Sequence, residues 1–173
     1  MERISISNFY KNGEFIFEDN SSLLNVVLNG EELAQNEFNL FLTERANVNL
    51  LILNLKEDSI INIVQNNNSF LRIECLFSKE HKNTKISAFL KKNAEIEGFF
   101  ADFSILDFTN VVDIHLNEEG ASARWKVASL SSKKDNKTFD ISLFHHHGNT
   151  YGVIDNYGVC KDDGKLVFSG TSH

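Results

Sequence analysis

Three consecutive histidines, His145, His146 and His147, are the residues whose type and spacing most directly suggest chemistry. Neutral imidazole is a common metal ligand, and on a strand His145 and His147 point to one face while His146 points to the other. A cupin metal site would add a Glu within a few residues, and none follows here. Alternatively, His145 and His147 continue an inward row begun by Ile141 and Leu143, or cap a corner of the chain. We therefore assign no metal ligand, and keep a metal-dependent small-molecule enzyme using His145 and His147 as an alternative.

The two cysteines, Cys75 and Cys160, lie far apart and form no Cys-x-x-Cys pair. Cys160 precedes Lys161, and a thiolate beside a lysine could ligate iron or carry a persulfide. A single cysteine gives no cluster-binding spacing, because iron–sulfur clusters usually take four ligands. We therefore interpret Cys160 as a small residue at a strand end, and Cys75, which alternates with Leu71 and Ile73, as a core residue.

Carboxylates offer another kind of chemistry, because β-helical polysaccharide enzymes place acidic and basic side chains on one groove-facing row. Glu95 and Glu97 share one face of an expected strand, and we expect them to face Ser122 and Arg124 as a charge-complementary outer ladder. Asp162 begins an Asp-Asp-Gly segment that we expect to form a type I′ hairpin turn. No coil stacks acidic residues in register with another, so a carbohydrate-active β-helix enzyme remains an alternative.

The composition limits the class of protein. The 24 acidic and 17 basic residues give a net charge of −7, which argues against a sequence-independent nucleic-acid binder. No apolar run approaches the roughly 20 residues that span a bilayer, and residues 1–5 lack the basic-then-apolar order of a secretory signal. We therefore predict a cytoplasmic protein with reduced cysteines that binds neither nucleic acid nor membrane. Because 42% of the residues are apolar, we expect a folded core.

Apolar and polar residues alternate with a period of two along most of the chain, whereas helical periodicity is not sustained. The clearest example is the row of Ala121, Ala123, Trp125 and Val127, which is interleaved with polar residues. We expect one face of that strand to be buried and the other to be exposed to solvent, so the sequence predicts an all-β protein.

Turn residues recur at intervals in the twenties, each after an apolar pair and a few polar residues. Asn and Gly suit such corners because they tolerate positive φ. A period of this length predicts a parallel, right-handed β-helix of about five to six coils over residues 1–173 as a single domain. A β-sandwich is the competing interpretation, but it does not require turns at one position of a longer unit. The expected corners are Asn47, Asn68, Asn93, Gly120 and Asn149, with Gly170 as a sixth.

Residues 117–173 contain an ordered set of short motifs: an acidic-Gly-Ala coil start, a strand ending in His, a Thr corner, a Gly-Val turn and a Phe-x-Gly coil end. In their order and spacing these motifs resemble the β-helix core of the SufB/SufD family of iron–sulfur cluster assembly proteins. Residues 40–116 agree with that family only in coil pattern, and residues 1–39 show no clear match. The motifs are Glu119-Gly120-Ala121, Phe139 to His145, Asn149-Thr150, Tyr157-Gly158-Val159 and Phe168-Ser169-Gly170.

The resemblance implies a non-catalytic scaffold or assembly subunit, similar to SufD. Its implied partners are a SufB-like subunit and a SufC-type ATPase, or a second copy of itself. The family's Cys and His positions linked to cluster formation, and its ATPase-docking surface, lie beyond the position that matches His173. No catalytic, cofactor-binding or metal-binding residue is therefore carried over, and we expect either part of a longer protein or a short family member. We expect the final coil, around Val167 and Phe168, to be covered by a second protomer or a partner, because a bare apolar edge would aggregate.

Overall fold

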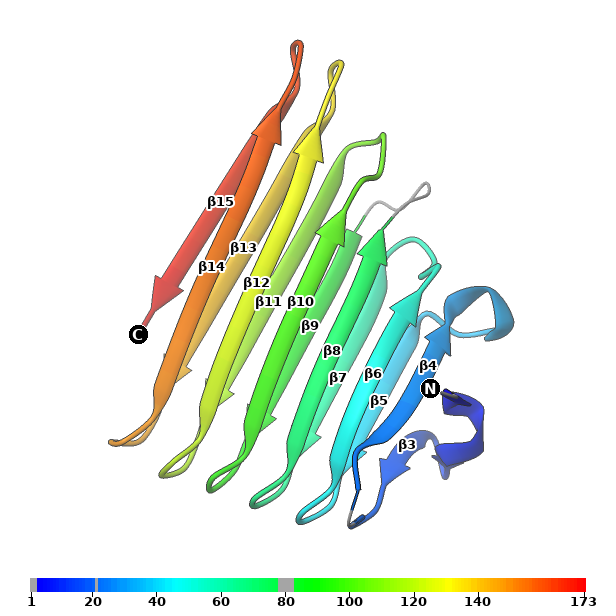
Figure 1. The fold of residues 1–173 in the computed structure, drawn as a ribbon, viewed down its shortest axis with the longest axis vertical. Helices are drawn as coiled ribbons and strands as arrows, with labels where there is room; N and C mark the ends of the chain where they lie inside the picture. Colours follow the sequence, from blue (N-terminus) through cyan, green and yellow to red (C-terminus); the bar gives the residue numbers. More distant parts are fainter. Residues whose placement is uncertain (1–2, 21, 78–82) are drawn as a thin grey trace.

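The computed structural model describes residues 3–20, 22–77 and 83–173, which fold into a parallel β-solenoid of about six turns. From Glu14 onward the chain alternates between two sheets, so that successive strands lie in different sheets and each strand pairs with the strand two positions along the chain (Figure 1). The predicted all-β, parallel β-helix of five to six coils is confirmed.

Sheet A is seven-stranded and sheet B is eight-stranded within the described residues. Sheet A has the order β1 (Ile4–Ser5), β4 (Leu24–Asn29), β6 (Asn47–Leu53), β8 (Phe70–Phe77), β10 (Glu95–Asp102), β12 (Ser122–Ser131) and β14 (Tyr151–Cys160). Sheet B has the order β15 (Lys165–Ser172), β13 (Asn136–His145), β11 (Phe108–Leu116), β9 (Asn83–Leu90), β7 (Ser59–Gln65), β5 (Glu37–Leu42), β3 (Glu14–Phe17) and β2 (Tyr10–Lys11). Two 3₁₀ turns complete the described elements, η1 (Ile6–Phe9) and η2 (Gly30–Glu32).

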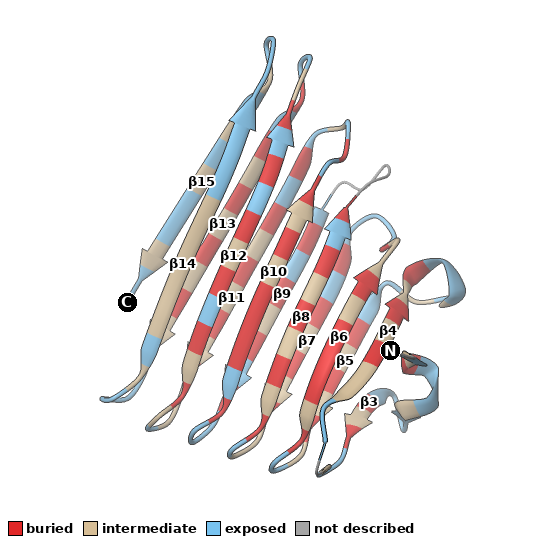
Figure 2. Cartoon of the chain, in the orientation of Figure 1, coloured by how far each residue is buried: buried red, intermediate tan, exposed pale blue. Residues whose placement is uncertain are grey.

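The core lies between the two sheets and is built from every second residue of each strand. Figure 2 shows this alternation as buried bands that cross the strands of the inner coils. On β12 the side chains of Ala123, Trp125 and Val127 are buried, whereas Arg124 is exposed, as the alternation predicts. Burial of the apolar side chains at every second position is the main favourable contribution to the free energy that holds the coils together.

One corner of the solenoid is formed by residues with positive φ that stack from coil to coil. Each backbone N–H in this column, up to Gly120, donates to a carbonyl of the following coil. The first of these corners is at Arg45 and not at Asn47, and Gly170 lies inside β15, so these two predicted turn positions are wrong. The corner residues are Arg45, Asn68, Asn93, Gly120 and Asn149, with φ of 60°, 58°, 54°, 75° and 59°.

Subtracting these corner positions gives intervals of 23, 25, 27 and 29 residues, so each coil is two residues longer than the previous one. The strands lengthen accordingly, from seven residues in β6 to ten in β12 and ten in β14. The solenoid therefore widens toward its red, C-terminal end (Figure 1).

The narrow end is covered by the N-terminal segment. Ile6 of η1 is buried, and the rings of Phe9 and Phe17 lie 5.1 Å apart. The short strand β2 pairs antiparallel with β3, so the edge of sheet B has a different geometry here from the parallel coils. The two ends of the solenoid are thus unlike each other.

Candidate interaction surface

At the wide end, β14 and β15 are the outermost strands of their sheets, and each pairs with a neighbour on one side only. The N–H of Tyr151 donates to the carbonyl of Ala121, and the N–H of Lys161 donates to that of Ser131. Alternate residues of a strand direct their backbone groups to opposite sides. The N–H and C=O groups of the even-numbered residues of β14 therefore point to the open edge, and β15 is arranged in the same way.

Inside this last coil, side chains pack closely against two glycines of β14. A side chain at Gly152 would meet Leu143, and one at Gly158 would meet Leu166 and Phe168. Leu166 and Phe168 pack against the core and are only partly buried. The glycines let these side chains approach the backbone, but the inward side chains of the last coil stay partly exposed, so both the strand edges and the end of the core are open here.

The outer faces of the last coils expose large apolar side chains. Tyr157 and Val159 on β14 are 63% and 61% exposed, and Val167 on β15 is 54% exposed. Tyr157 and Val159 line an open groove of about 620 Å³ together with Phe103 and Leu130. Figure 2 shows that β14 and β15 lack the buried bands of the inner strands. Apolar groups beside open backbone edges are typical of a surface that binds another protein.

The outer face of sheet A carries the predicted charge ladder. Glu95 lies opposite Ser122, and Glu97 lies opposite Arg124, as expected. Glu97 Oε2 also accepts hydrogen bonds of 2.9 and 2.6 Å from Nε and Nη2 of Arg72, while Arg124 Nη1 lies 3.8 Å from Glu97 Oε1. Glu97 is therefore held between two arginines of the neighbouring coils, which fits a structural role.

The histidines of the candidate metal site do not converge. His145 ends β13, and its Nδ1 lies 2.7 Å from Oγ1 of Thr150 across the corner, whereas His147 is exposed and its Nδ1 lies 2.8 Å from the carbonyl oxygen of Gly148. The strand ends before His147, so the two rings do not share a strand face. His145 caps the corner, which is one of the two structural roles that the sequence suggested.

The cysteines lie in contrasting environments. Cys75 is buried on β8, as predicted, and burial raises the pKa of its thiol well above the ordinary value. Cys160 is exposed at the end of β14, the position predicted for it. Neither forms a disulfide among the described residues.

The residues proposed for sugar chemistry are far apart. Glu95 and Glu97 begin β10, whereas Asp162 lies in the corner beyond the end of β14. Glu97 is in register with Val153 of β14, and Asp162 lies nine residues further along, so at about 3.3 Å per residue roughly 30 Å separates them. The predicted hairpin is also wrong, because this turn joins sheet A to sheet B; Asp162 has a φ of 58°, and Gly164 is not at positive φ.

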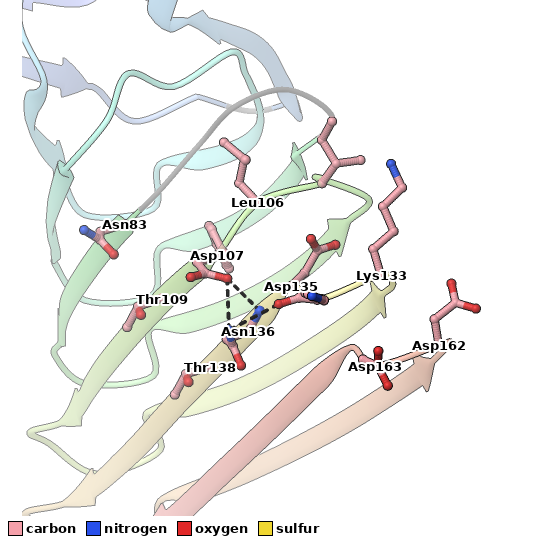
Figure 3. A pocket seen from close by; sticks show the side chains of 13 residues that line it. Asn83, Leu106, Asp107, Thr109, Lys133, Asp135, Asn136, Thr138, Asp162 and Asp163 are labelled. Carbon is pink, nitrogen blue, oxygen red and sulfur yellow. Dashed lines mark hydrogen bonds between the residues drawn. The ribbon is translucent and has the colours of Figure 1, made fainter.

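Asp162 instead lines a groove of about 1090 Å³ (Figure 3). Its floor contains a polar row of Asn83, Thr109 and Thr138, which lie in register on β9, β11 and β13. Within it, Asp107 Oδ1 accepts hydrogen bonds of 2.8 and 3.3 Å from the backbone and side-chain nitrogens of Asn136. Asp107 and Asn136 are thus hydrogen-bonded to each other inside the groove.

A buried ion pair joins Lys137 and Asp102 inside the wide half of the solenoid. Lys137 Nζ donates to Asp102 Oδ2 at 2.8 Å and to the carbonyls of Ser104 and Leu130 at 2.7 Å each. Asp102 also accepts from the hydroxyls of Ser104 and Ser129. The sequence interpretation missed this network, although Lys137 has the same parity as the buried residues of β13.

A second missed feature is an aromatic column on the outer face of sheet B. The ring of His115 stacks between Phe89 and Phe144, with centroids 4.7 and 4.6 Å apart. Nδ1 of His115 lies 2.9 Å from Nε2 of His146, which follows β13. The strand register, which places His115 opposite both Phe89 and Phe144, could have shown the column.

The fold and this surface define a parallel β-solenoid that presents two strands with one open edge each at its wide end. Within residues 3–20, 22–77 and 83–173, no group of three or more His, Cys, Asp or Glu side chains is placed to hold a metal ion. In the same residues, no helix has the length and apolarity needed to cross a membrane. No family model, no curated protein and no solved structure matches the chain.

Proposed function

We propose that this chain is a non-catalytic scaffold subunit of iron–sulfur cluster assembly that acts through protein contacts in a SufBCD-like complex. Its partners are a SufB-like subunit and a SufC-type ATPase, or a second copy of itself. The observation that supports the proposal is the open edge of β14 and β15 in the segment 117–173, the segment that resembles the SufB/SufD core.

The two edge strands are ten and eight residues long, and half of their backbone groups face outward. An added strand from another chain would pair with these groups by β-augmentation. Tyr157, Val159 and Val167 flank the two edges and are exposed in the free chain. A bound partner would bury these side chains, and that burial would supply the apolar part of the binding free energy. Backbone pairing and apolar burial together provide the affinity and register that a scaffold requires.

The experiment measures complex formation with purified SufB-type and SufC-type subunits and with the chain alone, by size-exclusion chromatography with light scattering. We expect a stable complex in at least one of these mixtures. A chain that carries Val159→Lys and Val167→Lys should lose that complex, because charges beside an edge oppose strand addition.

Ile60→Lys is the matched control, because Ile60 is also an exposed apolar residue, 38% exposed, but lies on an inner coil at β7. This variant should form the complex as the unmodified chain does. A complex that survives both edge substitutions, or a chain that stays monomeric with every partner, contradicts the proposal.

A further inference from the structure

The imidazoles of His115 and His146 lie edge to edge in nearly one plane. Their ring planes differ by 6°, their centroids are 5.3 Å apart, and Nδ1 of His115 faces Nε2 of His146 at 2.9 Å. His115 is held in its orientation because Phe89 and Phe144 stack on its two faces. His146 lies in the corner after β13 and is exposed.

We infer that His115 and His146 form a two-imidazole site for a divalent transition-metal ion of the copper, nickel and zinc class. Imidazole nitrogens bind these ions at about 2.0–2.1 Å, so two nitrogens that coordinate one ion side by side lie about 3 Å apart. The observed separation of 2.9 Å is that of a hydrogen bond between nitrogens that face each other, so the two nitrogens are near enough to share one ion once a ring turns. An ion on the line between the two nitrogens would lie too close to both, so the exposed His146 ring must rotate until both lone pairs converge on the ion at about 2.0–2.1 Å. The ion then takes the place of the shared hydrogen bond.

The proton balance of this exchange is simple. In the neutral pair, one of the two facing nitrogens carries a hydrogen and the other accepts it. When the metal binds, that hydrogen moves to the far nitrogen of its own ring, by way of water, so both facing nitrogens offer lone pairs. Two neutral imidazoles therefore bind the ion without net release of a proton, and waters fill the remaining coordination positions.

The surroundings favour a cation at this place. Asp113 lies two residues before His115 on the same face of β11, and its charge acts on His115. The pair of His115 and His146 differs from the one that the sequence suggested, because His145 and His147 are engaged elsewhere.

The test measures Cu²⁺ and Zn²⁺ binding to the full chain, prepared without a histidine tag, by isothermal titration calorimetry. Paramagnetic resonance of the Cu²⁺ sample counts the coordinated nitrogens. His115→Phe preserves the aromatic column and removes one ligand, and His146→Gln removes the other. Each should weaken the tightest site by more than about tenfold, since even loss of an outer-shell partner of a ligand has an effect of that size. Each should also reduce the nitrogen count from two to one.

His147→Gln is the control, because His147 neighbours the site in sequence but its Nδ1 lies 2.8 Å from the carbonyl oxygen of Gly148. It should leave the affinity and the nitrogen count unchanged. Equal affinity in the unmodified chain and in the doubly substituted His115→Phe, His146→Gln chain overturns the inference. An equal loss in His147→Gln overturns it as well, since binding would then be shared among exposed histidines.

Discussion

His115 and His146 face each other through ring nitrogens 2.9 Å apart, although 31 residues separate them in the chain. The solenoid creates this contact because one coil of its wide half is nearly that long, so side chains one coil apart become neighbours. The same repetition stacks Phe89, His115 and Phe144 into one column on the outer face of sheet B.

The His115 and His146 pair makes stability depend on pH in the metal-free chain. Partial burial and the charge of His146 lower the pKa of His115 in the folded state, and Asp113 opposes this shift. The folded chain therefore binds fewer protons than the unfolded chain, whose histidine titrates near pH 6.5, so this contribution is present above that pH and is lost as the pH falls. In urea unfolding with a chelator, the free energy of unfolding should fall less steeply between about pH 7.5 and 5.5 in His115→Phe than in the unmodified chain. Identical slopes would contradict this assignment.

The buried pair of Lys137 and Asp102 should be critical for stability. Asp102→Ala leaves an uncompensated ammonium in the interior, and we expect the free energy of unfolding to drop by about 3–5 kcal/mol. Asp155→Ala is the matched control, because Asp155 forms a half-exposed pair with Lys126 at 3.9 Å. That change should cost less than about 1 kcal/mol. Equal losses in chemical denaturation of the two variants would show that the buried pair has no special role.

The close packing of Gly98 against Trp125 gives a second test of the core. A Cβ at Gly98 would meet the Trp125 ring, which is fully buried, so Gly98→Ala should lower the free energy of unfolding by about 1–3 kcal/mol. Gly148→Ala is the comparison, because a Cβ at Gly148 would meet no atom within 4 Å. A thermal melt in which both variants unfold at the same temperature would argue against this packing.

The two thiols should react at very different rates. Cys160 is exposed, whereas Cys75 is buried with a raised pKa, so its reactive thiolate is rare in the folded state. A thiol reagent at pH 8 should label Cys160 at once and Cys75 only after urea is added. Mass spectrometry of the digested protein identifies the labelled residue, and rapid labelling of Cys75 in native buffer would contradict the described core.

The sequence predicted the fold because it depends on two periods that are visible in the residues. Alternation placed Trp125 and its neighbours inside, and the recurrence of Asn and Gly placed most corners. Arg45 was missed because an arginine gives no local sign of positive φ. Gly170 was misread because a glycine can also lie inside a strand at negative φ, as it does in β15.

The candidate sites were harder to predict, because they depend on register between coils. His146 was read as a residue of a His-x-His strand, yet β13 ends at His145, so His146 turns toward His115 of the previous coil. The register of strands so distant in sequence follows from coil length, and the coils of this chain differ in length. For the same reason, the partners of Lys137 on other strands were not evident from its own position.

The central claim, that the open edge of the last coil binds another protein, is tested most directly by hydrogen–deuterium exchange. The chain is measured alone and in complex with a SufB-type subunit, a SufC-type ATPase or a second copy. We predict that binding protects the amides of the even-numbered residues in β14 and β15, while exchange in β7 and the other inner strands stays unchanged. Protection confined to other strands, or a complex in which β14 and β15 exchange as fast as in the free chain, would contradict the account.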